Sequence, residues 1–164
     1  QALAVHGRTR ACAFRGEAEY DTIADIVAAV DLPVFANGDI DSPQRAAEVV
    51  ARTNAAGVMI GRAAQGRPWL CGQIATYLDT GKCPPEPDLT RRFELLRRHL
   101  ESLHEFYGEF MGVRIARKHV GWFLDYNSSD PGLKRRFNQL DTASDQLHFI
   151  QQAYDQTISE VLAA

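Results

Sequence analysis

Apolar residues form two different patterns over the first eighty positions of the chain. In three places they run together in segments too short for helices, at 2–5, 32–37 and 56–61. After these runs they recur every three or four positions, over 20–30, 42–53 and 67–81. Short continuous runs favour buried strands, and longer periodic stretches favour helices. The sequence therefore predicts a β-α-β-α-β-α order with a parallel sheet and short connections.

Capping residues and chain breaks mark the limits of these elements. Ser42 and Pro43 are the residue types favoured at the N-cap and the first position of a helix. Gly81 follows the third predicted helix, where glycine commonly ends a helix. The proline-rich segment "GKCPPEPDLT" at 81–90 then predicts a domain boundary.

The pattern is helical throughout the second half of the chain. Three sets of apolar residues recur at helical spacing: Phe93, Leu96, Leu100, Leu103 and Tyr107; Val113, Ala116, Val120 and Phe123; Leu147, Ile150, Tyr154, Ile158 and Val161. Asp141 or Thr142 is suited to cap the last of these helices, with Asp145 as partner in a capping-box-like pair. This half is predicted to form a small helical bundle.

The composition is ordinary for a soluble globular protein, with 45% hydrophobic and 24% charged residues among 164. No apolar run approaches the roughly 18 residues of a membrane span, and no signal peptide opens the chain. Three cysteines outside any CxxC or Cys/His cluster indicate neither a disulfide framework nor a metal site, so we expect a reduced, cytoplasmic setting. Because the chain starts without methionine in a strand-like segment, we expect it to be part of a longer protein.

Charge is distributed unevenly along the chain. The net charge is -3, but residues 110–139 hold six basic residues against two acidic ones, and residues 140–164 hold four acidic residues and no Lys or Arg. Arg114, Arg117 and Lys118 share one helix face by their spacing. Charge alone fits a solvated face, and it also fits a stripe that contacts a nucleic-acid backbone.

Glycine and polar residues follow each of the three predicted strands. The strand ends are "HGRTR" at 6–10, "NGD" at 37–39 and "GR" at 61–62. Ligands of β/α proteins gather at the carboxyl ends of parallel strands, and glycine-rich turns with a nearby cation suit a phosphate group. Taken singly, each motif also fits a tight loop, a helix cap or a structural histidine. Their occurrence on three consecutive strands favours a binding site.

Four segments together carry a family resemblance: "VHGRTRACAFRGEAEYDTI", "PVFANGDI", "MIGRAAQGRPW" and "YGEFMGVRIARKHVGWFL". They resemble tRNA-dihydrouridine synthases, with most likeness to the bacterial B-type branch. The resemblance implies an α/β plus all-α chain: the C-terminal part of a flavin-binding (β/α)8 TIM barrel over 1–82, followed by a helical tRNA-binding domain over 83–164. It further implies FMN as cofactor, NADPH as reductant, and reduction of the uridine C5–C6 double bond in tRNA.

The resemblance assigns roles to particular residues. Those expected to bind the flavin are His6, Asn37, Gly38, Asp39, Gly61 and Arg62. Those expected to face tRNA from the helical domain are Arg114, Arg117, Lys118 and His119. Arg8 and Arg10 are expected to face RNA at the barrel mouth.

The family's proton-donating cysteine, and a lysine near the flavin ring, precede the region that this chain matches. Cys12 lies outside the donor's motif, so we expect no catalytic residue in this chain. We therefore expect the chain alone to be inactive, and unstable or associating without the N-terminal half that completes the barrel. Two alternatives stay open: a non-catalytic RNA-binding module, and another FMN-dependent barrel reductase of the dihydroorotate type.

Overall fold

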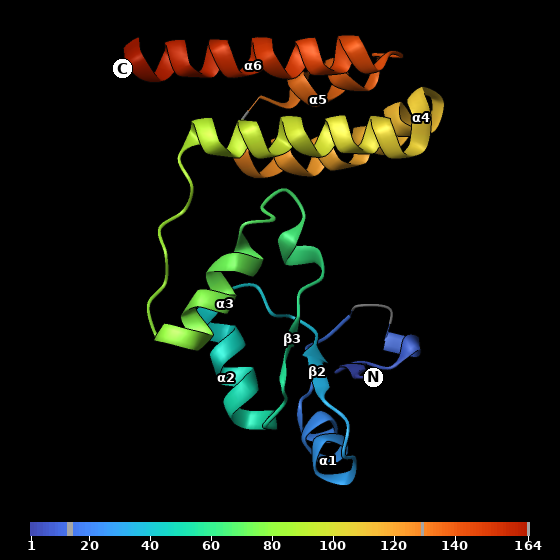
Figure 1. Cartoon of the computed structure of the whole chain (residues 1–164), viewed down its shortest axis with the longest axis vertical. Helices are drawn as coiled ribbons and strands as arrows, with labels where there is room; N and C mark the ends of the chain where they lie inside the picture. Colours follow the sequence, from blue (N-terminus) through green and yellow to red (C-terminus); the bar gives the residue numbers. More distant parts are fainter. Residues whose placement is uncertain (13–14, 129, 164) are drawn as a thin grey trace. The chain divides into compact units, whose positions relative to one another are not determined.

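The computed structural model describes residues 1–12, 15–128 and 130–163, with side-chain surroundings described up to residue 159 (Figure 1). The chain divides into two compact units, Gln1–Pro85 and Glu86–Ala164, and the division falls inside the proline-rich segment. Each unit is described by itself. Among the described residues, no helix combines the length and the apolar character needed to cross a membrane.

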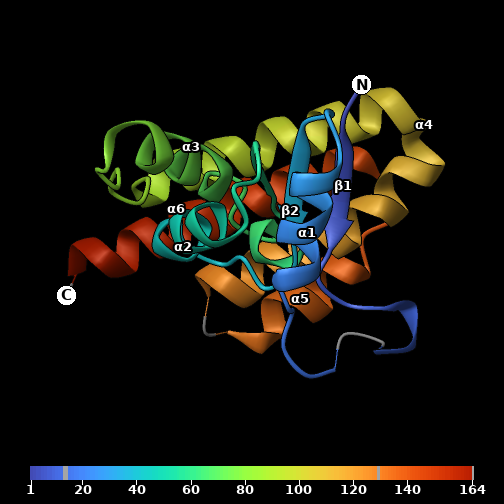
Figure 2. The same ribbon diagram turned by 90° about the horizontal axis from the view of Figure 1, so that it is seen from below.

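The first unit contains a three-stranded sheet. Its strands are β1 (Leu3–His6), β2 (Val34–Asn37) and β3 (Gly57–Met59). They are parallel and lie in the order β1-β2-β3, so the prediction of a parallel sheet is confirmed. Figure 2 shows β1 and β2 side by side. Because successive strands are neighbours, their carboxyl ends meet along one edge.

A helix follows each strand, at α1 (Asp21–Ala29), α2 (Pro43–Thr53) and α3 (Leu70–Thr80). Ser42 caps α2 as predicted, because its Oγ accepts a 3.3 Å hydrogen bond from the amide of Arg45. Gly81 ends α3 in the left-handed conformation at φ 71°. The third helix starts three residues later than predicted because hydrogen-bonded turns occupy positions 64–70. Two short 3₁₀ turns, η1 (Arg10–Cys12) and η2 (Arg62–Ala64), lie at strand ends.

The two faces of the sheet have different surroundings. Val34 and Ala36 are buried on one face, in a core with Ile23, Val49 and Leu70 of the three helices. The residues that alternate with them project from the opposite face, where Phe35 and Met59 are exposed. By the strand register, Ala4, Phe35 and Gly57 share this second face. The covered face forms the core, and the second face carries His6 and Asn37 at the strand ends.

The second unit consists of α4 (Leu89–Asn127), α5 (Pro131–Asn138) and α6 (Ala143–Ala163). Helix α4 is interrupted at Gly108, whose φ of 71° and ψ of 169° are not helical. The chain reverses there, so the two arms of α4 lie side by side as a hairpin (Figure 1). The contact of His99 with His119, at 3.2 Å between ring nitrogens, joins the arms.

Most of the predicted core of this unit is buried, including Leu100, Val120 and Phe123. Tyr107 continues the helical spacing in the sequence, but 48% of this residue is exposed. Helical spacing fails there because α4 reverses at the next residue. Thr142, rather than Asp141, caps α6: its hydroxyl accepts from the amide of Asp145 at 3.1 Å and donates to that side chain at 2.7 Å.

Two exposed glycines offer a matched test of the hairpin. An added Cβ would meet no neighbouring atom at either Gly108 or Gly72, but only Gly108 has a positive φ. We expect Gly108→Ala to reduce the free energy of unfolding by about 1–3 kcal/mol, the cost of a backbone region that only glycine adopts readily. Gly72→Ala, inside α3, should instead add about 0.5–1 kcal/mol. Chemical denaturation measures both, and equal effects would contradict the strained reversal.

Candidate functional site

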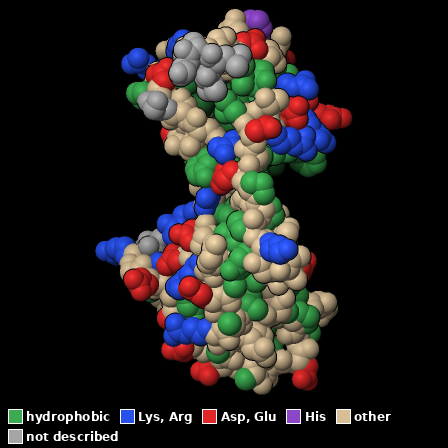
Figure 3. All heavy atoms as spheres, turned by 90° about the vertical axis from the view of Figure 1, so that its left-hand side faces the viewer, with side chains coloured by type: hydrophobic (Ala, Val, Ile, Leu, Met, Phe, Trp, Pro, Cys, Tyr) green, Lys and Arg blue, Asp and Glu red, His purple; other side chains and the backbone are tan. Residues whose placement is uncertain are grey.

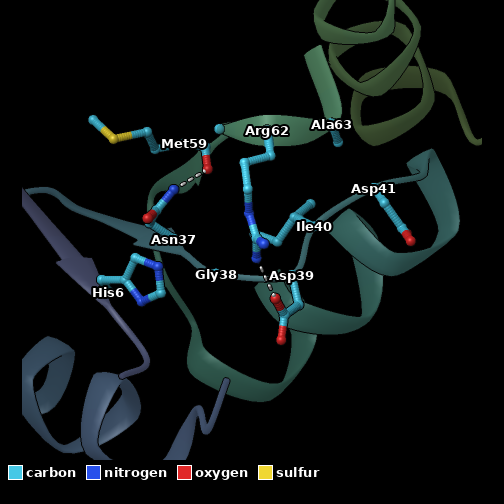
Figure 4. Close-up of a pocket in the computed structure, with 10 residues that line it drawn as sticks. His6, Asn37, Gly38, Asp39, Ile40, Asp41, Met59, Arg62 and Ala63 are labelled. Carbon is cyan, nitrogen blue, oxygen red and sulfur yellow. Dashed lines mark hydrogen bonds and ion pairs between the residues drawn. The ribbon is translucent and has the colours of Figure 1, made fainter. Parts of the chain in front are cut away.

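The three strand ends form the rim of one cavity of about 520 Å³ (Figure 4). The register places His6 beside Asn37 and Asn37 beside Met59, on the sheet face away from the helices. All six residues predicted to bind a flavin line this cavity: His6, Asn37, Gly38, Asp39, Gly61 and Arg62. The structure therefore brings together residues that lie up to 56 positions apart in the sequence.

Asn37 and Gly38 fix the loop after β2. The Asn37 side chain donates from Nδ2 to the carbonyl of Met59 at 2.6 Å, which ties the ends of β2 and β3 together. Gly38 has φ 124°, and an added Cβ would lie 2.7 Å from the Cβ of Ala18. The buried Tyr20 hydroxyl donates to the Gly38 carbonyl at 2.7 Å. Only glycine meets both the conformational and the steric demand here.

Asp39 connects three segments through its carboxylate. It accepts hydrogen bonds from both terminal nitrogens of Arg8, one of them at 2.8 Å, and from the amide of Ala18 at 2.8 Å. The guanidinium of Arg62 approaches it to 3.5 Å, as Figure 4 shows. The hydrogen bonds from Arg8 hold the pKa of this carboxyl below its ordinary value, against the opposing effect of partial burial. Asp39 is thus an organising anion between two arginines.

The segment after β3 presents glycine and arginine to the cavity. An added Cβ on Gly61 would meet no atom within 4 Å, so the glycine leaves open space at the cavity wall. Arg62 begins η2 with a largely exposed side chain. Arg67 supports this segment, donating from Nε to the Ala63 carbonyl at 3.0 Å and from its terminal nitrogen to the Asp41 carbonyl. Arg67 is not among the site residues predicted from the sequence, although it lies in the "GRAAQGRPW" segment that contributes to the family resemblance.

A second candidate site lies in the helical unit, in a basic groove of about 490 Å³. Its lining residues are Arg114, Arg117, Lys118, Gly121, Trp122, Lys134 and Asn138. Each of two cations covers an aromatic ring four residues away, Lys118 over Trp122 at 5.2 Å and Arg114 over Phe110 at 3.9 Å. Basic and acidic side chains are interspersed over the helical unit in the upper part of Figure 3. The groove is therefore a local basic surface within a mixed one.

Arg117 and His119 take inward positions within this helical unit. Arg117 donates to the Leu140 carbonyl at 3.0 Å and to the Asp141 carboxylate at 2.7 Å, which holds the turn before α6. His119 faces His99, and burial lowers the pKa of both imidazoles from an ordinary value near 6.5. Both rings are consequently neutral at about pH 7. The positive charge of the groove comes from its lysines and arginines.

Comparisons with known proteins match the chain over nearly its whole length. The family model described as "Dihydrouridine synthase (Dus)" matches residues 1–159. The chain belongs to the dihydrouridine synthase family. Proteins named tRNA-dihydrouridine synthase B are 48% identical over 97% of this chain in Vibrio cholerae and 56% identical over 86% of it in Pseudomonas putida. These matches identify the B-type branch of the family.

The chain spans about half the length of the curated relatives that it matches. It covers 49% of the Vibrio cholerae protein, and 48% of a tRNA-dihydrouridine synthase B from Xanthomonas axonopodis that is 51% identical to it. The family match continues through both compact units. Both the strand-end cavity and the basic groove thus lie within the region that the family model matches.

The residues predicted from the family resemblance to face RNA have different surroundings in the structure. Arg114 and Lys118 are exposed in the groove, and Arg10 is exposed in η1. The Arg8 side chain is only 5% exposed and pairs with Asp39, a geometry that favours a role in positioning the loop. RNA contact stays a prediction for all of these residues, as does flavin contact for the six residues that line the strand-end cavity. No group of three or more potential metal ligands occurs among the described residues.

The lowered pKa of Asp39 gives the stability of this protein a defined pH dependence. The unfolded carboxyl titrates near 3.9, and pairing with Arg8 puts the folded pKa below that value. The stabilisation is therefore present in full above about pH 5 and is lost as pH falls through the folded pKa. We expect Asp39→Asn to lower the melting temperature at about pH 7, and the difference from the wild type to shrink below about pH 4.

Thermal unfolding of the full-length protein across this range measures the effect. Asp25→Asn, at an exposed position on α1, serves as the matched control and should change the melting temperature little at any pH. A wild-type-to-Asp39→Asn difference that is constant with pH would contradict the charged pairing.

Proposed function

We propose that this chain is the C-terminal half of an FMN-dependent tRNA-dihydrouridine synthase, which reduces the uridine C5–C6 double bond in tRNA with NADPH. The observation that carries the proposal is the convergence of His6, the Asn37-Gly38-Asp39 loop and the Gly61-Arg62 pair on one cavity. The family match adds the substrate class, because relatives of about twice this length are named tRNA-dihydrouridine synthases.

The cavity fits the phosphate end of FMN. Arg62 supplies an exposed cation, and Asp39 restrains it from the side. Gly61 leaves room for the backbone to approach a phosphate, because no neighbouring atom fills the space where a side chain would begin. His6 and Asn37 occupy the β1–β2 side of the same cavity, where they would contact the rest of the cofactor. Bound FMN would supply the hydride for uridine reduction and would itself be reduced by NADPH.

We further propose that the three parallel strands belong to a (β/α)8 barrel completed by an N-terminal half, which supplies the proton-donating cysteine. Two features support this arrangement. Helices cover one face of the sheet, and the other face exposes apolar side chains such as Phe35 and Met59. A barrel interior would cover that second face and place the strand ends around a common mouth. The helical unit would then be the tRNA-binding domain.

The basic groove supports one alternative, a module that binds RNA without catalysis. Arg114 and Lys118 offer cations beside aromatic rings, the combination found in nucleic-acid sites. The convergence of six predicted flavin-binding residues on the strand-end cavity favours the enzyme instead, because an RNA-binding module needs no cofactor site.

Activity of the full-length protein tests the enzyme directly. With FMN and NADPH it should form dihydrouridine in tRNA that lacks this modification, detected by mass spectrometry of the nucleosides. Arg62→Ala should weaken FMN binding about 10- to 100-fold, because a charged hydrogen-bonding partner of the phosphate is lost. Arg98→Ala, an exposed arginine on α4, is the control and should bind FMN normally. Absence of dihydrouridine with the flavin-loaded wild type would refute the proposed activity.

The groove makes a separate prediction about salt. Each phosphate contact contributes about 0.7–0.9 to the slope of the logarithm of affinity against the logarithm of salt concentration. Lys118→Met should therefore weaken tRNA binding and reduce that slope by about one, whereas Lys118→Arg should preserve it. Fluorescence anisotropy at several salt concentrations measures the slope. An unchanged slope in Lys118→Met would exclude Lys118 from phosphate contact.

A further inference from the structure

The end of the α4 hairpin exposes several large apolar side chains. Phe106 is 81% exposed and Phe110 is 67% exposed, and Tyr107 and Met111 beside them are exposed as well. These four residues, here called the hairpin end, flank the reversal at Gly108. A contiguous group of exposed aromatic residues is unusual on a soluble protein and marks an interaction surface.

The rings of the hairpin end lie next to a cation. Phe106 and Tyr107 contact each other edge to face, with ring centroids 4.8 Å apart. The guanidinium carbon of Arg114 lies 3.9 Å from the centroid of the Phe110 ring. Arg114 also lines the basic groove, so the Phe110 ring of the hairpin end adjoins the groove. An aromatic platform beside cations is complementary to a nucleotide, which combines a flat base with a phosphate.

Two carboxylates near the hairpin end indicate which part of a nucleotide can lie there. Glu105 lies beside Phe106 at the edge of a cavity of about 650 Å³. Glu109 accepts a 3.1 Å hydrogen bond from the amide of Ala143 at the start of α6. These acids disfavour a run of phosphates over the hairpin end itself. They are compatible with an uncharged base there and with a backbone that follows Arg114 and Lys118.

The geometry points to a base-stacking site at the hairpin end: an unpaired tRNA nucleotide places its base against Phe110, while Arg114 holds its phosphate. This inference rests on the proposed function, which supplies tRNA as the partner. It adds a contact that depends on aromatic faces rather than on charge. It also gives a role to the Phe110 ring, which is exposed and does not belong to the core of the helical unit.

The test uses tRNA binding by the full-length protein with substitutions at one exposed ring. We expect Phe110→Ala and Phe110→Leu each to weaken binding about 5- to 100-fold, the loss that corresponds to one stacked base. Phe110→Tyr should bind as the wild type does, because it keeps the aromatic face. The salt slope should stay unchanged in Phe110→Leu, since no phosphate contact is removed and Arg114 remains.

A direct signal comes from Phe110→Trp, whose added fluorescence should be quenched by tRNA relative to a wild-type control measured in the same way. Wild-type affinity in Phe110→Leu would overturn stacking, as would a dimer that dissociates in Phe110→Ala or a melting temperature lowered by that variant. These failures differ from failure of the proposed function, in which the wild type itself forms no dihydrouridine. In that case the inference falls as well.

Discussion

The carboxylate of Asp39 is the interaction on which the strand-end cavity depends. One side chain joins Arg8 from the loop after β1, the amide of Ala18 further along that loop, and Arg62 from the segment after β3. Without this anion, two guanidinium groups would converge on the cavity and repel each other. The positive φ of both Gly38 and Asp39 turns the chain there. The turn at Gly38 and Asp39 therefore links the segments that follow all three strands.

Much of this arrangement follows from the sequence, because the carboxyl ends of parallel neighbouring strands must meet. The order of strands and helices was enough to predict that the residues after each strand lie close together. His6, Asn37 and Arg62 do line one cavity. The partner of Asp39 was not predictable in the same way. Arg8 lies 31 positions away, and nothing in the pattern distinguishes an arginine that faces RNA from one that holds a loop. That distinction needs the three-dimensional path of the loop after β1.

In the helical unit, residue spacing predicted the helix face of a side chain but not its surroundings. Spacing places Arg114, Arg117 and Lys118 on one face, but their environments differ. Arg117 turns to the Leu140 carbonyl and the Asp141 carboxylate, whereas the other two cover aromatic rings four residues away. Tyr107 continues the helical spacing but is exposed, because Gly108 ends the helical period one residue later. The first departure arises from contacts between segments and the second from a backbone reversal, and a helical period encodes neither.

The uncovered face of the sheet links the stability of the first unit to its chemistry. The sheet face that exposes Phe35 and Met59 also carries His6 and Asn37, which lie at the cavity rim. Any structure that covers the apolar part of this face must also close the cavity from that side, since the two regions are adjacent on strands of three or four residues. In the proposed barrel, the N-terminal half would supply the missing core contacts and exclude water from the cofactor in a single step. Folding and assembly of the flavin site would then be one event.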